Sequence, residues 1–444
     1  MYFRRKAYDK LMEWKQKYAD QYAILLEGAR RVGKSTIAEE FAKKEYESYI
    51  LIDFANVNKD IIDCFNDVYN LDLFFLRIQT ITGIQLIKHR SVIIFDEVQL
   101  FPKARQAIKY LVKDGRYHYI ETGSLISIKK NVKDILIPSE EMKLPIYPMD
   151  YEEFLWVVKP GSYQIIEDLY RTGKSIGQAV HRTLMRNFRI YMAVGGMPQA
   201  VQAYIDGKSF AEIDDVKRSI IQLYEDDFRK IDSSGKISML YHSIPGQLSK
   251  GFRRFAFERA VGKKKTNGDE QKIFDLIDSR TVLVCYNTTE PRVSLSLTKD
   301  ISSYKMYSSD TGLFVTLLFI DRPIAENELY KKFLSDKLPA NLGYLYENAV
   351  AQMIAAGKHE LYYHTWDKEN STHYYEADFL LANGAKVNAV EVKSSGSGKH
   401  ESLTVFKHKY SDVVNECFVI SQKDVGFENG IRYLPVYMVP FLVS

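Results

Sequence analysis

Apolar and polar segments alternate regularly over the first third of the chain. Four apolar runs, at residues 22–27, 46–57, 91–99 and 117–124, have the length and composition of buried strands. An amphipathic helical pattern covers residues 4–20, and helical patterns also lie between the first three strands. Because strands that alternate with helices form parallel sheets, this part of the chain is predicted to be a doubly wound parallel sheet.

Helical periodicity dominates the next stretch. Residues 150–229 are mostly helical by pattern, with a break at Gly195–Pro198, where two glycines and a proline favour a turn. Short helical patterns from Ser233 are followed by two apolar segments, 281–287 and 292–298. Helices followed by a short hairpin are typical of a winged helix, so we expect these two segments to pair as its strands.

A second α/β unit is predicted from about Leu338 onward. A helical pattern at 342–356 precedes two strand patterns, DFLLA and VNAVEVKS, which are joined by the turn sequence NGAK at 383–386. A chain of 444 residues is also too long for one ordinary hydrophobic core. The sequence therefore predicts a multidomain α/β protein.

Composition adds few constraints. Hydrophobic residues make up 46% and charged residues 27% of the chain, as in ordinary globular proteins, and a net charge of +4 is too small to predict nucleic-acid binding by itself. The three cysteines lie far apart in sequence, which argues against a disulfide framework or a cysteine-rich zinc site. The first residues turn polar at once, and the longest apolar run, 312–320, is too short to cross a bilayer. We expect a cytoplasmic protein without a membrane segment.

The sequence GARRVGKS, from Gly28 to Ser35, matches the phosphate-binding loop G-x-x-x-x-G-K-S between a strand and a helix. Gly28 and Gly33 let the backbone wrap closely around phosphates, whose oxygens accept hydrogen bonds from successive amides. Lys34 supplies charge to the β- and γ-phosphates of ATP, and the Ser35 hydroxyl can ligate Mg²⁺. Arg31 is a further candidate for phosphate contact, although surface charge explains it equally well.

Polar residues end the next predicted strands. Asp96 follows four apolar residues and is placed to hold Mg²⁺ through water, while Glu97 could polarise the attacking water. Ser124 closes a further strand, where a polar residue can sense the γ-phosphate, although a simple turn is equally compatible. Spacing does not choose an arginine finger among Arg105, Arg116, Arg182, Arg186 and Arg189.

A basic segment lies in the middle of the chain. Residues 250–265 contain seven Lys or Arg residues, a single acid and three interleaved phenylalanines. Arg253, Arg254 and Lys263 could hold the phosphates of a nucleic acid while the aromatic rings stack on bases. A solvated basic helix whose phenylalanines belong to the core is an equal alternative.

Carboxylates gather near the C-terminal end. Glu391 and Lys393 lie two positions apart on one predicted strand and so project together, and Asp378 can meet them from the neighbouring strand. Glu347, on the preceding helix, could supply another carboxylate, and Glu376 is a secondary candidate. Such oxygen ligands suit Mg²⁺ or Mn²⁺, and a metal at Glu347, Asp378 and Glu391 could activate water beside a scissile phosphate, with Lys393 orienting that water or stabilising charge.

Motifs along most of the chain resemble one family. GARRVGKS, FDEVQLFP, ETGS, LPIYPMDYEEF, GGMPQAV and YSSDTGL resemble bacterial and archaeal AAA-type ATPases with a C-terminal domain of unknown function. LGYLYENAV, EADF and VEVKS resemble the PD-(D/E)xK restriction-endonuclease-like fold found in that family. The resemblance implies an AAA-type P-loop ATPase domain at 1–148, a helical lid-like region at 149–230, a winged-helix-like domain at 231–335 and a nuclease-like domain at 336–444.

The resemblance also assigns roles to residues. It implies that Gly33, Lys34, Ser35 and Thr36 bind ATP and Mg²⁺, that Asp96 and Glu97 form the Walker B pair, and that Ser124 is a sensor. Glu347, Asp378, Glu391 and Lys393 match the nuclease core, although Ala377 stands where the motif's name has proline.

Two functions are compatible with these features. The first is a Mg²⁺-dependent ATPase that controls a nuclease-like domain acting on DNA, which is favoured over RNA. The second is a signalling or scaffold NTPase whose terminal domain binds nucleic acid or protein without cutting. A homo-oligomer is possible in either case.

Overall fold

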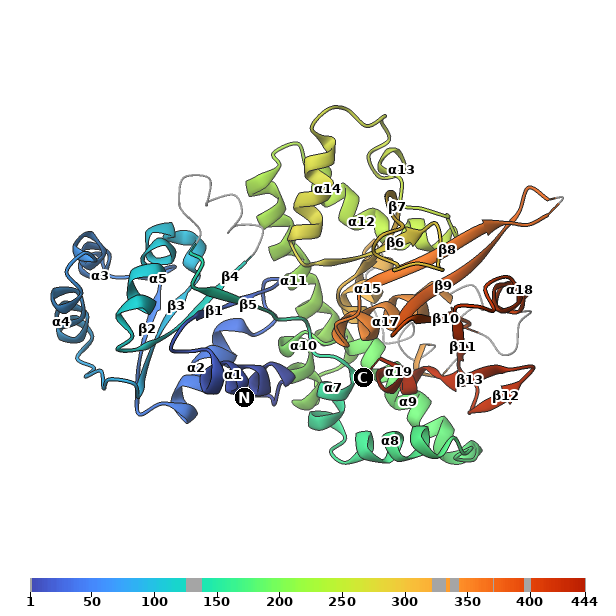
Figure 1. Cartoon of the computed structure of the whole chain (residues 1–444), viewed down its shortest axis with the longest axis horizontal. Coiled ribbons are helices and arrows are strands. Elements are labelled where there is room, and N and C mark those ends of the chain that lie inside the picture. The colour runs from blue at the N-terminus through green and yellow to red at the C-terminus, as the bar shows by residue number, and fades with distance from the viewer. Residues whose placement is uncertain are drawn as a thin grey trace. The chain divides into compact units, whose positions relative to one another are not determined.

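The computed structural model describes residues 2–124, 138–321, 333–335, 343–369, 371–394 and 401–443. The chain forms two compact units (Figure 1). The first contains Met1–Tyr147 and the short segment Asp278–Arg280, and the second contains Pro148–Ile277 and Thr281–Ser444.

The first unit is built on a five-stranded sheet in the order β2-β3-β4-β1-β5, and all of its strand pairs are parallel. This confirms the parallel sheet predicted from the alternation of strands and helices. Its strands are β1 (Ala23–Glu27), β2 (Ser48–Asp53), β3 (Ser91–Asp96), β4 (His118–Gly123) and β5 (Glu141–Pro145).

Helices cover this sheet through two sets of buried residues. One core cluster joins Phe95 and Tyr119 of the sheet to Phe74 of α4 and Leu111 of α5. The helix α2, whose buried residues lie outside that cluster, packs against β2, β3 and β4, and α1 packs against α2. The helices are α1 (Lys6–Lys17), α2 (Lys34–Glu45), α3 (Lys59–Cys64), α4 (Leu71–Thr82) and α5 (Pro102–Asp114).

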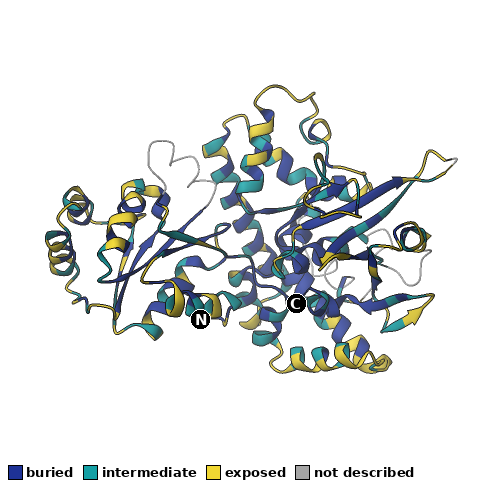
Figure 2. Ribbon diagram, viewed as in Figure 1, coloured by how far each residue is buried: buried dark blue, intermediate teal, exposed yellow. Residues whose placement is uncertain are grey.

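The second unit contains an eight-stranded mixed sheet in the order β12-β13-β11-β10-β9-β8-β6-β7. The hairpin of β9 and β10 forms at the predicted NGAK turn. Figure 2 shows most of the strand residues in the centre of this sheet as buried. The strands are β6 (Val282–Thr288), β7 (Lys299–Ser308), β8 (Leu361–Asp367), β9 (Tyr374–Asn383), β10 (Lys386–Val392), β11 (Val414–Ser421), β12 (Gly426–Glu428) and β13 (Ile431–Pro435).

The second strand of the expected winged-helix hairpin was placed wrongly. Residues 292–298 form turns, and β6 pairs with β7, which begins only at Lys299. The apolar residues Val293, Leu295 and Leu297 alternate as in a strand, but Val293 is 47% exposed and Leu297 80% exposed. Because β6 also pairs with β8, the hairpin continues into the C-terminal sheet.

Helices make up the rest of the second unit, and the chain breaks between α9 and α10 at the predicted Gly195–Pro198 turn. The finer division at 149–230, 231–335 and 336–444 stays a prediction. No helix among the described residues is long and apolar enough to cross a membrane. The helices are α7 (Tyr151–Val158), α8 (Ser162–Thr172), α9 (Gln178–Val194), α10 (Pro198–Ile205), α11 (Phe210–Ile231), α12 (Lys236–Ser249), α13 (Phe257–Val261), α14 (Asp269–Asp278), α15 (Thr311–Leu318), α17 (Gly343–Ala356), α18 (Glu401–Lys409) and α19 (Val439–Leu442).

A buried polar network joins three of these helices. Lys217 of α11 is fully buried, and its ammonium group donates to the carbonyl oxygen of Ala193 at 2.7 Å and lies 3.6 Å from Asp214. Asp310 caps the N-terminus of α15 and accepts the backbone N–H of Gly196 at 2.6 Å. The GGMP and SSDTGL motifs therefore meet in the interior, where they fix the packing of α9, α11 and α15.

Replacing Lys217 with Met is expected to change how stability depends on pH. Desolvation by burial lowers the pKa of Lys217 from 10.5 to about 8, although Asp214 and Asp310 partly oppose this effect. Between these pH values the folded chain has lost a proton that the unfolded chain keeps, so the wild type gains stability relative to the variant as pH rises. The full shift corresponds to roughly 3 kcal/mol.

Urea unfolding of both proteins between about pH 7.5 and about pH 9.5 measures this difference. Tyrosines that titrate near the top of this range affect both proteins and cancel in the comparison. A difference in unfolding free energy that stays flat across the range would contradict the desolvated state of Lys217.

Candidate functional site

The phosphate-binding loop follows β1 directly, and α2 begins at Lys34. A Cβ atom on Gly28 would lie 2.2 Å from the carbonyl oxygen of Ile146, so only glycine fits between these two backbones. Gly33 has a φ of 97°, in the left-handed region that disfavours side chains. β1 lies between β4 and β5 in the sheet, and open α/β sheets bind ligands beyond the carboxyl ends of such central strands.

Two hydroxyl groups of this unit converge on Asp96, at the end of β3. The Ser35 hydroxyl donates to Asp96 Oδ1 at 2.7 Å, and the Thr122 hydroxyl donates to the same oxygen. The Lys34 ammonium group donates to the carbonyl oxygens of Gly28 and Ala29, at 3.2 and 2.9 Å, within its own loop. The structure thus brings together the loop serine and the strand aspartate that the sequence pointed to, with Thr122 as a second donor.

Glu97 is held in an unusual conformation beside Asp96. Its φ of 54° lies in the left-handed region, which costs a residue with a side chain of the order of 1–3 kcal/mol and is common at functional sites. The backbone N–H of Glu97 lies 3.3 Å from the Thr122 hydroxyl, and the Gln99 amide donates to its carboxylate. Gln99 was missed because a lone glutamine after an acidic pair carries no sequence signal.

The remaining predicted residues of this site lie around the loop. Arg31 is exposed with a φ of 68°, and Thr36 is exposed in the first turn of α2. Ser124 is buried directly after β4, while its neighbour Thr122 makes the contact with Asp96. No motif indicates Arg5. Its guanidinium donates to the carbonyl oxygens of Val32 and Tyr147 at 2.9 and 2.7 Å and so holds the phosphate-binding loop in place.

Arg105 has a structural role. Its guanidinium forms two hydrogen bonds of 2.7 Å with Glu141, and both side chains are at most 3% exposed. A guanidinium that is buried in this way is out of reach of a phosphate. Arg105 is therefore unsuitable as an arginine finger.

The carboxylates predicted in the C-terminal part do meet in the second unit. Glu347 of α17 and Glu376 of β9 both bind the ammonium group of Lys305, at 3.3 and 2.6 Å. Asp378 Oδ2 accepts the backbone N–H of Val392 at 2.7 Å. We call Glu347, Glu376, Asp378 and Glu391, with the ammonium groups of Lys305 and Lys393, the carboxylate cluster.

Lys393 pairs with Glu391, as the two-residue spacing on one strand predicted. One oxygen of this carboxylate bonds the ammonium group, while the other, Oε2, is buried and has no hydrogen-bond partner. A buried carboxylate oxygen without a partner is costly, and it is an available ligand atom.

Charge repulsion within the carboxylate cluster is visible in the pKa values. Burial raises the pKa of Asp378 well above its usual value, and Glu347, Glu376 and Glu391 raise it further. Burial also raises the pKa of Glu376, although Lys305 opposes that effect. Burial disfavours the charge on Lys305, but the surrounding carboxylates raise its pKa well above the usual value. Burial is thus the main cause of these shifts in the carboxyl pKa values, and the crowding of carboxylates adds to it.

Lys305 was missed, and the secondary candidate Glu376 is its ion-pair partner. Lys305 lies on β7, where the sequence indicated no charged site residue, and only the pairing of strands brings it beside Glu376. Among the described residues, no three His, Cys, Asp or Glu side chains are arranged to hold one metal ion. Lys305 engages Glu347 and Glu376, and Glu376 is also hydrogen-bonded to Asp378.

The basic segment reaches the same sheet. The Arg253 guanidinium donates to the Thr365 hydroxyl at 3.0 Å and lies 5.0 Å from the centre of the Tyr374 ring. Thr365 lies opposite Glu376 in the pairing of β8 with β9, so Arg253 lies beside the carboxylate cluster. Arg254 and Lys263 are exposed, and Lys263 lies in the loop before α14. The interleaved phenylalanines divide, since Phe255 and Phe257 are buried and Phe252 is half-buried.

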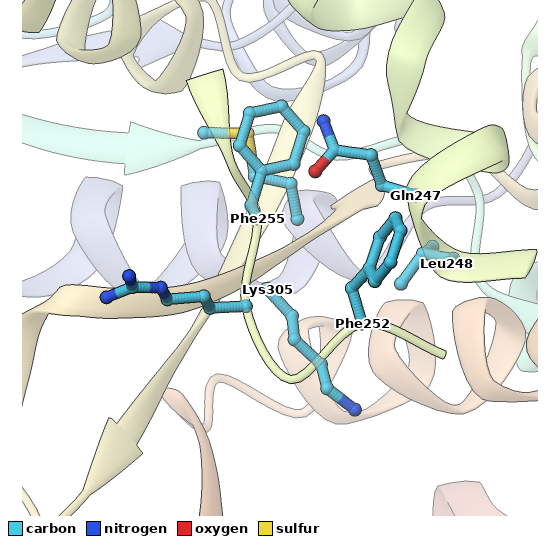
Figure 3. Close-up of a pocket in the computed structure, with 7 residues that line it drawn as sticks. Gln247, Leu248, Phe252, Phe255 and Lys305 are labelled. Atoms are coloured by element: carbon cyan, nitrogen blue, oxygen red, sulfur yellow. The ribbon is translucent and has the colours of Figure 1, made fainter. Parts of the chain in front are cut away.

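A small hollow borders this segment (Figure 3). It is lined in part by Phe252, Arg254 and Phe255, and its volume of about 10 Å³ has room for about one water molecule. The Lys305 side chain runs away from Phe255 and Gln247 in this view. The hollow is too small to receive a base or a nucleotide.

Comparisons with known protein families match three parts of the chain. Residues 20–155 match the model of an AAA domain, residues 185–323 match a domain of unknown function (DUF8612), and residues 342–439 match a domain of unknown function (DUF4143). The first match covers the loop, the Asp96 strand and the sheet around them. The chain therefore carries an AAA-type P-loop ATPase domain.

Comparisons with whole proteins add little. A solved signal-transduction ATPase of the STAND class with a tetratricopeptide repeat sensor, from Pyrococcus horikoshii, is 9% identical, with a TM-score of 0.28 over 79% of this chain and 48% of that chain. This chain thus spans about half of that protein. A protein from Vibrio cholerae is 12% identical, with a TM-score of 0.18 over 81% of this chain and 91% of that chain. Both TM-scores are too low to establish a shared fold. No curated protein matches.

Replacing Gly28 with Ala is expected to disable the phosphate-binding loop. The added methyl group would press on the Ile146 carbonyl at 2.2 Å, and that backbone is held by a 2.7 Å hydrogen bond from Ile146 N–H to Glu27. We expect affinity for a fluorescent ATP analogue to fall at least about tenfold, with a loss of stability of about 1–3 kcal/mol. Gly246→Ala, where a methyl group meets open space, is the matched control. Unchanged nucleotide affinity in Gly28→Ala would refute the close-approach argument.

Proposed function

We propose that this protein is a Mg²⁺-dependent ATPase whose nucleotide cycle controls a nuclease-like site that acts on DNA. The observation that carries the proposal is the meeting of Asp378, Glu391 and Lys393 in one partly buried cluster, on the same chain as an AAA-type ATPase domain. An ATP-controlled site of this kind would couple hydrolysis to the handling of a phosphodiester substrate.

The residues of the ATPase site fit ATP and Mg²⁺. Ser35 and Asp96 already share a hydrogen bond of 2.7 Å, so their oxygens are close enough to serve one magnesium ion, directly or through water. Lys34 now bonds carbonyl groups of its own loop and would exchange them for phosphate oxygens. Bound Mg²⁺ would neutralise charge on the β- and γ-phosphates. Glu97, held by Gln99 beside the strand end, would orient the attacking water and accept its proton.

Asp378 and Glu391 fit a divalent cation in the carboxylate cluster. The buried Oε2 of Glu391 has no hydrogen-bond partner, and the pKa of Asp378 is raised first by burial and then by the neighbouring carboxylates. Mg²⁺ is often held by one or two carboxylates, with water and substrate phosphate completing its shell, and Mn²⁺ has similar preferences. The ion would polarise a phosphate oxygen. Lys393, paired with Glu391, would orient the nucleophilic water.

The basic segment supports nucleic acid as the substrate class. Arg253 lies beside the cluster through Thr365 and Tyr374, and exposed Arg254 is its neighbour in sequence. Guanidinium groups at the rim of an acidic site can hold the phosphates that flank a scissile bond. Lys263 would extend this contact along the strand. DNA remains the favoured polymer.

A second function is favoured by one observation. Lys305 engages Glu347 and Glu376, and no triad of metal-binding side chains is assembled among the described residues. An NTPase of the signalling or scaffold type, with a domain that binds nucleic acid or protein without cutting, would need no such triad. A cytoplasmic location and assembly into a homo-oligomer are further predictions of either function.

Lys34→Ala and Glu97→Gln are expected to stop ATP turnover in different ways. Lys34→Ala removes the phosphate-binding charge and should weaken nucleotide binding, whereas Glu97→Gln removes the base and should keep ATP bound, with hydrolysis reduced by about 10²–10⁴-fold. Phosphate release and nucleotide retention on a filter measure both effects. Lys43→Ala, exposed on the same helix α2, is the matched control. Normal hydrolysis by Glu97→Gln would remove Glu97 as the base.

Metal-dependent cutting of plasmid DNA tests the nuclease-like site. With Mg²⁺ or Mn²⁺, and with or without ATP, the wild type is expected to nick or linearise the plasmid, while Asp378→Ala and Lys393→Ala should lose at least about 10²-fold of that rate. Asp63→Ala and Lys386→Ala, both exposed, serve as matched controls, and Lys386 lies on the same strand as Glu391. If the wild type cuts under none of these conditions, the binding-module function takes its place.

A further inference from the structure

Lys305 occupies a central position in the carboxylate cluster. It lies on β7 and is 7% exposed, and its Nζ atom contacts Glu376 Oε1 at 2.6 Å and Glu347 Oε1 at 3.3 Å. The Tyr307 hydroxyl donates to the same oxygen of Glu347. The ring of Tyr363 lies 5.3 Å from the ammonium group. An ammonium group bound by two carboxylates and bordered by an aromatic ring is in the environment of a bound cation.

The four carboxylates of the cluster differ in their hydrogen-bond and ion-pair partners. Glu347 and Glu376 are bound by Lys305, with Tyr307 as an additional donor to Glu347. Asp378 accepts one backbone N–H and also shares a side-chain hydrogen bond with Glu376, while Glu391 has one oxygen on Lys393 and one buried oxygen without a partner. The capacity to bind a further cation is therefore concentrated at Asp378 and Glu391.

The net charge of the cluster also matches one further divalent ion. With every group ionised, as ligands of a metal ion must be, four carboxylates and two ammonium groups give a net charge of −2, which one divalent ion balances. Without Lys305 the net charge would be −3, and Glu347 and Glu376 would lose the ammonium group that both contact. Enzymes that use two metal ions hold them about 3.5–4 Å apart on shared carboxylates, an arrangement that needs both halves of such a cluster.

We propose that Lys305 takes the place of a second metal ion and so makes the carboxylate cluster a site for a single divalent cation, held at Asp378 and Glu391. This inference rests on the proposed function, because it assumes that the cluster binds a divalent ion. It adds the stoichiometry of that ion and names Lys305 as the residue that sets it. Lys305 is a positioning residue, since it acts through Glu347 and Glu376.

Titration of the nucleotide-free full chain with Mn²⁺, with free Mn²⁺ followed by electron paramagnetic resonance, tests the inference. All proteins carry Ser35→Ala, so that the count reports the carboxylate cluster. We expect about one ion in this parent, about two in Lys305→Met, and about one in Lys305→Met/Glu376→Gln, which lacks the carboxylate needed for the second ion. Asp378→Asn should bind none. Circular dichroism with and without Mn²⁺ checks that each variant is folded.

Lys305→Gln keeps a hydrogen-bond donor near Glu376 and is expected to bind about two ions if Lys305→Met does not fold. Glu376→Gln alone tests the inference without changing the lysine. It should still bind about one ion, because Glu376 is held by Lys305 and is not a ligand.

About one ion in Lys305→Met or Lys305→Gln, with unchanged affinity, overturns the inference and leaves the proposed function intact. Loss of the ion in Glu376→Gln also overturns it. No bound ion in the parent and in both lysine variants removes the metal site of the proposed function itself.

Discussion

The four carboxylates of the carboxylate cluster need cations beside them, because their negative charges repel one another where water is partly excluded. This electrostatic constraint organises the second unit. Lys305 and Lys393 each hold part of the cluster. Lys305 lies on β7 and Lys393 directly follows β10, and these two strands lie on either side of β8 and β9 in one sheet. Burial, and then the neighbouring carboxylates, raise the pKa of Asp378. The basic segment at Arg253 lies at the border of the cluster, so acidic and basic side chains are neighbours there.

In the first unit, a few close contacts hold the residues of the phosphate-binding site. Asp96 accepts hydrogen bonds from the hydroxyl groups of Ser35 and Thr122, and Glu97 next to it has a strained backbone conformation. Gly28 lies so close to Ile146 that the loop has little freedom to move. Such a preformed site loses little entropy when it binds a nucleotide, and this suits an ATPase that must distinguish ATP from its hydrolysis products.

Local patterns were sufficient to predict the parallel sheet, the P-loop with Asp96, and the pairing of Glu391 with Lys393, because each depends on residues close in sequence or on strand periodicity. The second strand of the hairpin was misplaced, since Val293, Leu295 and Leu297 alternate like a strand but only Leu295 is buried. Lys305 and Arg5 were missed because long-range packing alone gives them their partners. The meeting of Gly196 with Asp310 likewise depends on tertiary structure.

Iron-directed cleavage of the polypeptide tests most directly whether the carboxylate cluster binds a divalent cation. Fe²⁺ with ascorbate and peroxide cuts a protein backbone beside the bound ion, and mass spectrometry locates the cuts. The account predicts cuts in β9 and β10 near Asp378 and Glu391, suppressed by excess Mg²⁺ and absent in Asp378→Asn. Cuts that fall elsewhere in the second unit, or that persist in excess Mg²⁺, would contradict a divalent-cation site at this cluster.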